Sequence, residues 1–342
     1  METMQRITKL GEKVLSGENL TFDEAFSLTD LPDNYVPLLL GVANLVREKF
    51  TGNKVDTCEI INARSGNCSE DCIFCAQSAH HRTTCPTYPL LQQNEILSAA
   101  KEAEGNGASR FCIVTAGCGS KHDTDFPDIL KAIEKIGRET TIDRCCSLGI
   151  LEPEHVEALK KAGITRYHHN LEGSRSFFPQ ICTTHTYDER VATVRLVKAA
   201  GLQTCVGGLF GLGETWRQRI ELAFELKELD VDSVPMNILN PVPGTPLADK
   251  PVMRPWDILK LFAIYRLILP TKILRFAGGR ERALGELLPL GFVAGINGML
   301  IGNYLTTEGQ KPAETMHTVR QLGLEPSVSQ ASQERSAATA TV

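Results

Sequence analysis

Apolar residues follow two different periods along the chain, and the change falls near residue 50. Up to Phe50 they recur at helical spacing, most clearly from Tyr35 onward, and Thr21 is a plausible capping residue. From Val55 onward, short apolar or β-branched runs alternate with amphipathic stretches, which is typical of βα units around a parallel sheet. The pattern therefore predicts an N-terminal helical cap over residues 1–50, packed on a larger α/β body.

Eight short runs have the composition of strands. They are Val55–Asn62, Arg110–Thr115, Thr141–Leu148, Thr165–Leu171, Gln203–Leu209, Ser233–Leu239, Lys272–Phe276 and Gly295–Ile301. Helices are predicted between them, at Gln92–Glu104, Pro127–Arg138, Pro153–Ala162, Asp188–Ala200, Thr215–Leu229 and Trp256–Leu269. This alternation predicts a (β/α)8 TIM-type barrel over residues 51–324, with a doubly wound open sheet as the alternative.

The C-terminal segment, residues 325–342, has no aromatic residue and no apolar periodicity. Such a segment has too little apolar surface to bury, so we expect a disordered tail.

The composition is that of an ordinary globular protein, with 42% hydrophobic residues, 23% charged residues and a net charge of -5. The acidic balance and the lack of basic patches argue against nucleic acid as a partner. The first 20 residues contain no apolar signal region and no later run is long enough to span a bilayer, so we expect a cytoplasmic protein that does not enter a membrane. In that reducing compartment, the eleven cysteines indicate metal ligation or redox chemistry rather than disulfides.

The loop after the first strand run carries a CxxxCxxC motif formed by Cys68, Cys72 and Cys75. Three thiolates so close together can hold three irons of a cubane cluster and leave the fourth iron open to a small molecule. Because chemistry in a barrel takes place at the carboxyl ends of the strands, this loop is in the right place for catalysis. The alternative is a zinc site, in which His80 or His81 supplies the fourth ligand.

A second group of residues stands on the strand runs themselves: Cys112, Cys145, Cys205 and Arg275. Alternate residues of barrel strands face the interior, so these four side chains can converge on one pocket. The alternative is simple packing, because a free cysteine behaves as a small buried hydrophobe.

Polar residues also mark the ends of two strand runs. The fourth run ends in His168, His169, Asn170 and Glu172, and the sixth contains Asn237 before a turn-rich loop. Residues at such positions in a barrel contact substrate and cofactor groups. For either histidine, however, a structural role explains the residue as well as a catalytic role does.

The short sequence motifs around the cysteines resemble those of the biotin synthase family, within the radical S-adenosylmethionine superfamily. Phe74 precedes the last cysteine of the loop, Asn62–Gly66 precede the motif, and Ala76–Ser78 follow it. Further matches lie around the barrel cysteines and around Arg275, so the resemblance covers almost the whole chain.

The resemblance implies a radical S-adenosylmethionine sulfurtransferase that converts dethiobiotin to biotin. It implies a [4Fe-4S] cluster on Cys68, Cys72 and Cys75, and an auxiliary [2Fe-2S] cluster that donates sulfur, on Cys112, Cys145, Cys205 and Arg275. It implies S-adenosylmethionine contacts from Phe74, Asn170, Glu172 and Arg190, and dethiobiotin contacts from His168, Asn170 and Asn237. Many family members carry asparagine in place of His168, and an aspartate often stands in place of Glu172.

The remaining cysteines are Cys58, Cys85, Cys118, Cys146 and Cys182. We expect them to pack or to be incidental, unless a larger auxiliary cluster recruits one of them. The resemblance also implies a low-potential electron donor of the flavodoxin or ferredoxin type and a homodimer. The competing hypotheses are another radical enzyme on the same barrel, such as an [FeFe]-hydrogenase maturase or a methylornithine synthase, and a non-enzymatic iron–sulfur or zinc protein.

Overall fold

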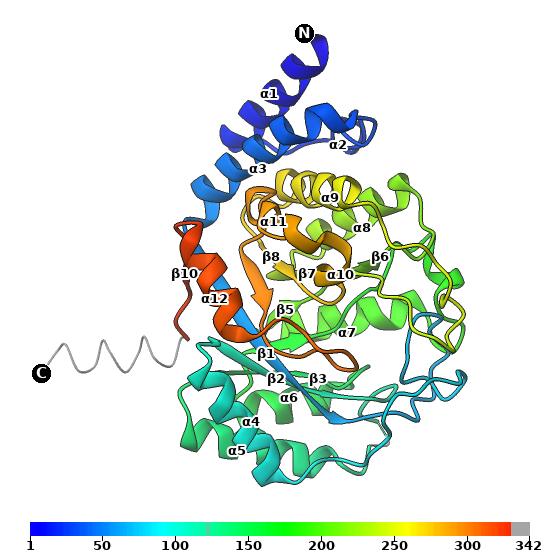
Figure 1. Ribbon diagram of the computed structural model, residues 1–342. Helices are drawn as coiled ribbons and strands as arrows, with labels where there is room; N and C mark the ends of the chain where they lie inside the picture. Colours follow the sequence, from blue (N-terminus) through cyan, green and yellow to red (C-terminus); the bar gives the residue numbers. More distant parts are fainter. Residues whose placement is uncertain (122, 330–342) are drawn as a thin grey trace, which may run out of the picture.

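A closed ring of parallel strands forms the body of the protein. The computed structural model describes residues 1–121 and 123–329. The ring consists of β1 (Lys54–Arg64), β2 (Arg110–Thr115), β3 (Asp143–Ser147), β4 (Arg166–His168), β5 (Gln203–Cys205), β7 (Ser233–Ile238), β8 (Ile273–Phe276) and β9 (Gly298–Leu300). Neighbours in this order pair in parallel and β9 pairs with β1, which closes the barrel (Figure 1). The predicted (β/α)8 barrel is confirmed, and the open-sheet alternative is wrong.

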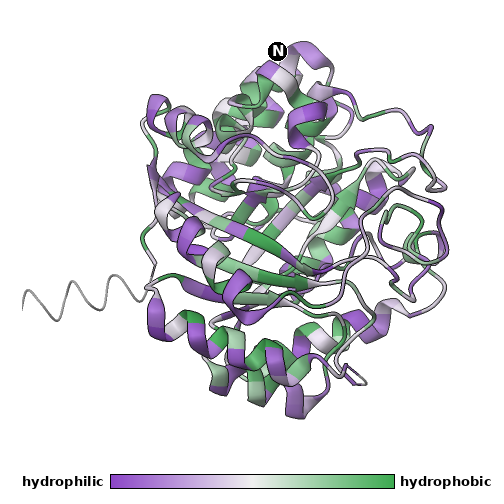
Figure 2. Ribbon diagram, turned by 60° about the horizontal axis from the view of Figure 1, so that its bottom comes forward, coloured by the Kyte–Doolittle hydropathy of each residue, from purple (hydrophilic) through white to green (hydrophobic). Residues whose placement is uncertain are grey.

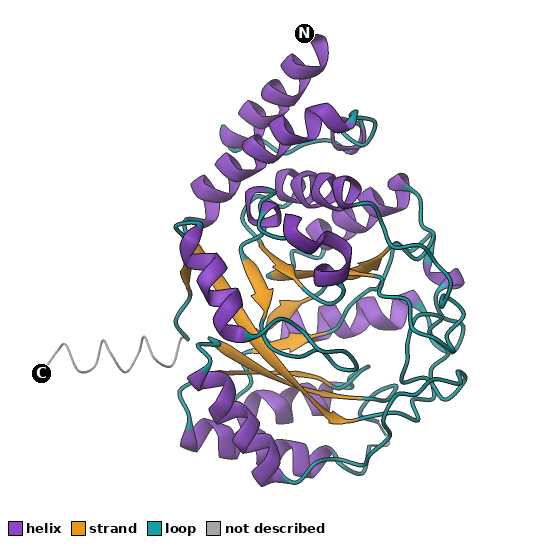
Figure 3. Ribbon diagram, in the orientation of Figure 1, coloured by secondary structure: helices purple, strands orange, loops and turns teal. Residues whose placement is uncertain are grey.

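Helices surround the barrel and alternate with its strands (Figure 3). They are α4 (Gln93–Gly105), α5 (Phe126–Glu139), α6 (Pro153–Ala162), α7 (Tyr187–Ala199), α8 (Trp216–Glu228) and α9 (Pro255–Ile268), followed by α10 (Arg280–Leu284), α11 (Leu290–Val293) and α12 (Pro312–Gln321). In α5 the residues Ile129, Ile133 and Ile136 are buried, which is the helical spacing of one apolar face. The green and purple sides of the helices in Figure 2 follow this division.

The N-terminal helices α1 (Glu2–Leu15), α2 (Phe22–Phe26) and α3 (Val36–Thr51) lie at one end of the molecule, next to α9 (Figure 1). Because α3 packs on α9, every residue from Ile258 to Ile268 is buried, including Lys260. The Lys260 ammonium donates hydrogen bonds to the carbonyl oxygens of Thr29 (3.1 Å) and Leu31 (2.7 Å). The cap is therefore docked by polar bonds as well as by apolar packing.

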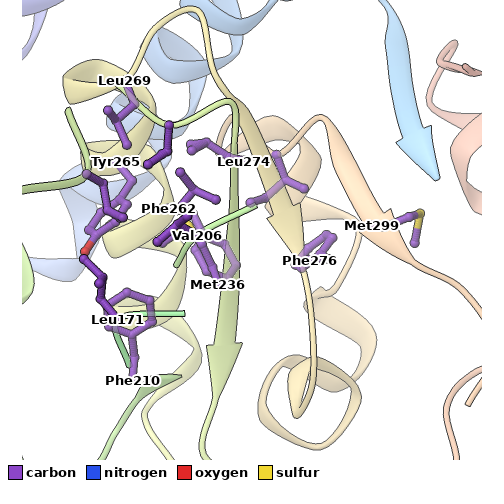
Figure 4. Close-up of a cluster of buried hydrophobic side chains, with 14 of the residues drawn as sticks. Leu171, Val206, Phe210, Met236, Phe262, Tyr265, Leu269, Leu274, Phe276 and Met299 are labelled. Atoms are coloured by element: carbon purple, nitrogen blue, oxygen red, sulfur yellow. The ribbon is translucent and has the colours of Figure 1, made fainter. Parts of the chain in front are cut away.

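Aromatic side chains fill the space between α9 and the strands β7 and β8 (Figure 4). The Phe276 ring meets the rings of Phe262 and Phe292 edge to face, with centroid distances of 5.6 and 5.3 Å. Such edge-to-face pairs add to the stability that apolar burial supplies. This core holds the strands that carry the functional side chains.

The predicted strand Gln203–Leu209 is divided in the structure. It forms β5 and then β6 (Gly208–Phe210), which pairs with β7. The strand is interrupted between them, at Gly207. A side chain at Gly207 would place its Cβ 2.0 Å from the carbonyl oxygen of Pro235 in β7. Pro235 has no N–H for a regular ladder, so the two strands approach closely and irregularly at this point.

Part of the segment predicted to be a disordered tail has a defined structure. Glu325–Pro326 form β10, which pairs in parallel with Lys54 and Val55 of β1. The hydroxyl of Ser329 donates a hydrogen bond to the Thr141 carbonyl oxygen at 2.7 Å. The expectation was wrong for residues 325–329, because backbone pairing needs no apolar periodicity; residues 330–342 lie outside the described residues. Within the described chain, none of the helices is both long enough and apolar enough to cross a bilayer.

Candidate active site

One cavity of about 400 Å³ extends from the loop after β1 into the barrel. Every residue that the sequence predicted for the site lines it: Cys68, Cys72, Phe74, Cys75, Cys112, Cys145, His168, Asn170, Glu172, Arg190, Cys205, Asn237 and Arg275. The predicted convergence of Cys112, Cys145, Cys205 and Arg275 on one pocket is therefore observed, and the loop cysteines line the same cavity. The chemical roles of these residues stay predictions.

Backbone hydrogen bonds fix the cysteine loop. The Cys68 amide donates to the Gln77 carbonyl at 3.0 Å, the Ala79 amide donates to the Cys68 carbonyl at 2.8 Å, and the Cys75 amide donates to the Cys72 carbonyl at 3.0 Å. Burial raises the pKa of the Cys75 thiol to about 11, and burial also raises the pKa of Cys68. Buried thiols of this kind become thiolates when they bind a metal, so three of them on one loop facing one cavity fit a [4Fe-4S] cluster.

The two histidines of the zinc alternative are engaged elsewhere. The Nε2 atom of His80 lies 2.9 Å from the Ser69 carbonyl oxygen, and the Nε2 atom of His81 lies 3.0 Å from the Cys72 carbonyl oxygen. Both rings bond to the backbone of the loop instead of completing a set of four metal ligands. The loop therefore offers three thiols rather than a closed zinc site.

Cys182 and His185 lie beside the loop, and the sequence did not predict this. The Cys72 sulfur, the Cys182 sulfur and a ring nitrogen of His185 all lie within 4.8 Å of one another. A hydrogen bond from Cys72 lowers the pKa of Cys182 to about 6 and raises that of Cys72. The spacing Cys-Thr-Thr-His was the signal in the sequence that could have identified this pair.

A polar chain connects the loop to the predicted S-adenosylmethionine residues. The Nε of Arg190 donates to Nε2 of His185 at 2.8 Å, so Nδ1 of His185 carries the proton and donates to Glu70. Arg190 also donates to the Asn170 carbonyl oxygen at 2.8 Å and lies 3.8 Å from the Glu172 carboxylate. Burial acts to raise the pKa of Glu70, but the hydrogen bonds from Thr184 and His185 lower it. Glu70 and His185 thus orient Arg190, although neither was predicted.

The backbone at the end of β4 is shaped to present Asn170 and Glu172. Glu172 has a φ of 66°, in the left-handed region that residues with a Cβ rarely adopt. The Asn170 side-chain oxygen accepts a hydrogen bond from the Gly207 amide at 3.1 Å, which ties this segment to the break after β5. Unusual backbone of this kind is concentrated at functional sites, where surrounding contacts maintain it.

Inside the barrel, the thiols of Cys112 and Cys145 are in contact. Cys112 on β2 stands directly opposite Cys145 on β3 and donates a hydrogen bond to it. This bond raises the pKa of Cys112 well above its usual value. Burial acts to raise the pKa of Cys145, but the same bond lowers it. The two sulfurs are therefore close enough to share one metal centre.

Cys205 is paired with His168 in the neighbouring strands β5 and β4. Burial acts to raise the pKa of Cys205, but the hydrogen bond with His168 lowers it to about 6. Burial acts to lower the pKa of His168, and the same bond raises it. The imidazole at this position thus favours the thiolate form of Cys205.

Charged groups form the floor of the cavity. Arg166 donates through both terminal nitrogens to the Asp56 carboxylate, at 3.2 and 3.4 Å, and Arg275 also bonds to this carboxylate. A further pair joins Arg110 and Asp143 at 3.2 Å. Three guanidinium groups and two carboxylates leave this floor positive, which suits thiolates above it.

Asn237 lies in the wall of the cavity, on β7. Its side-chain nitrogen donates to the Gly208 carbonyl oxygen at 3.3 Å, and its side-chain oxygen accepts from the Gly278 amide at 3.0 Å. These bonds fix the amide where a ligand can meet it. Residues 304–307, after β9, also line the cavity, and the sequence did not predict them.

Models of two protein families match the chain: "Radical SAM superfamily" over residues 63–226 and "Biotin and Thiamin Synthesis associated domain" over residues 235–325. Solved structures share the fold. A methylornithine synthase aligns with a TM-score of 0.82 over 96% of this chain and 99% of that protein, at 19% identity. An [FeFe]-hydrogenase maturase aligns with a TM-score of 0.82 over 96% of this chain and 76% of that protein, at 17% identity. The matched family model, over residues that include the cysteine loop, indicates a radical S-adenosylmethionine enzyme.

Comparison with curated proteins is more specific. A biotin synthase of Pelotomaculum thermopropionicum is 49% identical over 316 residues, which cover 92% of this chain and 98% of that protein. A biotin synthase of Clostridium acetobutylicum is 50% identical over 320 residues, with 93% and 98% covered. The chain belongs to the biotin synthase family. Membership implies a radical sulfurtransferase that uses a [4Fe-4S] cluster and S-adenosylmethionine, and it does not favour the maturase or methylornithine synthase alternative.

Proposed function

We propose that the protein converts dethiobiotin to biotin by radical insertion of sulfur, with S-adenosylmethionine as co-substrate. The observation that carries this proposal is the single cavity that joins two separate groups of thiols. The carbons that receive sulfur are unactivated and have no acidic proton, so acid–base catalysis alone cannot functionalise them. A radical generator and a sulfur source must therefore face the same substrate.

The two groups of thiols divide the chemistry between them. Cys68, Cys72 and Cys75 would hold the [4Fe-4S] cluster, and Cys112, Cys145, Cys205 and Arg275 would hold the auxiliary [2Fe-2S] cluster. When bound, the [4Fe-4S] cluster would supply the electron for reductive cleavage of S-adenosylmethionine, and the [2Fe-2S] cluster would supply the sulfur.

Polar residues between the two groups bind and orient the organic substrates. Arg190 is held by His185 and by the Asn170 carbonyl oxygen, so it presents a fixed cation to the carboxylate of S-adenosylmethionine. Glu172 lies in the same wall of the cavity and can accept from hydroxyl or ammonium groups. Phe74 and Asn170 complete this side of the proposed cofactor site.

Dethiobiotin would lie deeper in the cavity, against His168, Asn170 and Asn237. Amide and imidazole groups can pair with the ureido ring of this substrate, which offers both N–H donors and a carbonyl acceptor. The apolar side chains of Ile60, Val114 and Leu300 line the cavity as well and suit the aliphatic part of the molecule.

The proposal includes a low-potential donor of the flavodoxin or ferredoxin type, a homodimer and a cytoplasmic location. The reason for the location is that the chemistry needs reduced thiols, which a cytoplasm maintains.

The proposed function is tested by anaerobic assay of the protein after reconstitution with iron and sulfide. Reductant, S-adenosylmethionine and dethiobiotin are added, and biotin and 5′-deoxyadenosine are measured by mass spectrometry. We expect both products, with biotin strictly dependent on dethiobiotin. Formation of 5′-deoxyadenosine without biotin would reject sulfur insertion and would favour another radical S-adenosylmethionine activity.

A further inference from the structure

Two segments that are distant in the sequence run side by side at the cysteine loop. The Ile73 amide donates a hydrogen bond to the Ile181 carbonyl oxygen at 3.0 Å, and the Asp71 carboxylate accepts one from the Thr183 amide at 2.8 Å. The higher-numbered residue of one segment thus meets the lower-numbered residue of the other, so the two segments run in opposite directions. The residues between these two contacts are both cysteines.

Cys72 and Cys182 face each other at this point. Their sulfurs lie within 4.8 Å of each other, and the Cys72 thiol donates a hydrogen bond to Cys182. Residues that face each other in antiparallel segments have Cα atoms about 4.5–5.5 Å apart, within the range of about 4.4–6.8 Å that a disulfide bond joins. The two thiols are therefore placed to form a disulfide without a large movement of the backbone.

Polar contacts hold the Cys182 thiol beside Cys72. The Cys182 sulfur lies 3.0 Å from an Asp71 carboxylate oxygen and 3.3 Å from the Thr184 hydroxyl oxygen, and the residue is only 4% exposed. Cys72, in contrast, lines the cavity, so a small oxidant that enters the cavity meets Cys72 first. The three thiols of the loop motif suffice for the cluster, which leaves Cys182 without a role as a ligand.

We propose that Cys72 and Cys182 form a reversible disulfide when a peroxide reaches the cluster-free loop, and that this bond protects a cluster ligand from irreversible oxidation. Hydrogen peroxide converts the Cys72 thiol to a sulfenic acid and is itself reduced to water. The Cys182 sulfur then attacks the Cys72 sulfur, the S–S bond forms, and the hydroxyl group leaves as a second water with the Cys182 proton.

The two thiols lose two electrons in total, and the peroxide gains them. Without a partner thiol, the sulfenic acid can be oxidised further to a sulfinic acid, which a thiol reductant does not restore. The disulfide, in contrast, is returned to two thiols by exchange with such a reductant. The reaction needs only the cluster-free loop, whichever substrate the holoenzyme uses.

The test follows the fate of Cys72 in the iron-free, full-length protein. The protein is reduced, desalted anaerobically and treated with an excess of hydrogen peroxide, and the free thiols are then alkylated. Peptides are prepared without reduction and mapped by mass spectrometry. We expect Cys72 to be linked to Cys182, with Cys68 and Cys75 alkylated. Linkage of Cys72 mainly to Cys68 or Cys75, or an unlinked Cys72, would overturn the proposal.

Two variants test the protection itself. Cys182→Ser removes the partner thiol, and Cys118→Ser is the matched control, because Cys118 contacts Glu70 of the same loop. After peroxide and then dithiothreitol, the wild type and Cys118→Ser should recover nearly all of the Cys72 thiol. Cys182→Ser should recover several-fold less, with Cys72 found as sulfinic acid. Equal recovery in the three proteins, whether high or low, would contradict the protective role. Circular dichroism checks that the variants fold, and the peptide map of the wild type decides the question if they do not.

Discussion

Asp56 is the carboxylate that two arginines share at the floor of the barrel, and its removal gives a test of the electrostatics. Its carboxylate bonds to both Arg166 and Arg275, and the side chains of Asp56, Arg166 and Arg275 are only 15%, 3% and 3% exposed. In Asp56→Asn both guanidiniums keep their charge in a buried site without their shared partner. Removing one partner of a buried ion pair typically costs about 3–5 kcal/mol, so we expect a loss of that size in the free energy of unfolding.

The assay is urea unfolding of the iron-free, reduced protein, followed by circular dichroism. Asp128→Asn is the control, because the Asp128–Lys131 pair is exposed, with side chains at 54% and 63%. Surface pairs contribute about 0–1 kcal/mol, so the control should unfold almost like the wild type. A loss below about 1 kcal/mol for Asp56→Asn would refute the reasoning, since it would mean that water already screens this floor.

The pH dependence of this difference follows from the same contacts. Burial acts to raise the pKa of Asp56, but Arg166, Arg275 and Arg110 hold it well below its usual range. A depressed carboxyl pKa contributes stability above the unfolded value of about 3.9, and that stability is lost only as the pH falls through the folded value. The difference in unfolding free energy between wild type and Asp56→Asn should therefore stay constant between about pH 8 and pH 5. A difference that shrinks over that range would contradict the assigned ion pairs.

Three further predictions concern the loop, the polar chain and the cap. Cys68→Ala should abolish 5′-deoxyadenosine formation, because a cubane left with two thiolates loses iron, while Cys85→Ala should retain it; normal product from Cys68→Ala would reject the cluster assignment. His185→Ala should weaken S-adenosylmethionine binding roughly 10-fold, measured by equilibrium binding, because Arg190 loses an orienting partner; His185→Gln should restore part of it, and unchanged binding in the alanine variant would exclude that role. Lys260→Met should lower the free energy of unfolding by about 1–3 kcal/mol and speed proteolysis of the cap, because two buried carbonyls lose their donor; wild-type stability would show that the cap docks by apolar packing alone.

The fold was predictable because buried parallel strands read as short apolar runs between amphipathic helices. The ends of these runs were less predictable. The break after Cys205 depends on Pro235, which is distant in the sequence and meets Gly207 only in the folded barrel. The pairing of Glu325 with Lys54 likewise rests on backbone bonds that leave no side-chain pattern.

The site was predictable where its signal is local. The spacing of Cys68, Cys72 and Cys75 lies within one loop. Strand alternation only allowed the barrel cysteines to face inward, and the choice of Cys145 over Cys146 rested on the family resemblance. The charged floor was not predictable, because Asp56 meets its arginines only when three strands from distant parts of the chain close together. Nor did the sequence show that Cys58 lines the cavity while Cys146 does not, because the face to which a strand residue points is known only once the barrel is known.

The barrel cysteines as sulfur-source ligands are the central claim, and the ratio of biotin formed to 5′-deoxyadenosine formed tests it most directly. The ratio is measured in anaerobically reconstituted Cys145→Ala protein, with Cys146→Ala as the matched control. A cysteine that only packs costs on the order of 1 kcal/mol of stability when truncated, which would lower both products together or neither. We predict that Cys145→Ala still forms 5′-deoxyadenosine but almost no biotin, while Cys146→Ala keeps the wild-type ratio. A wild-type ratio in Cys145→Ala would contradict the account.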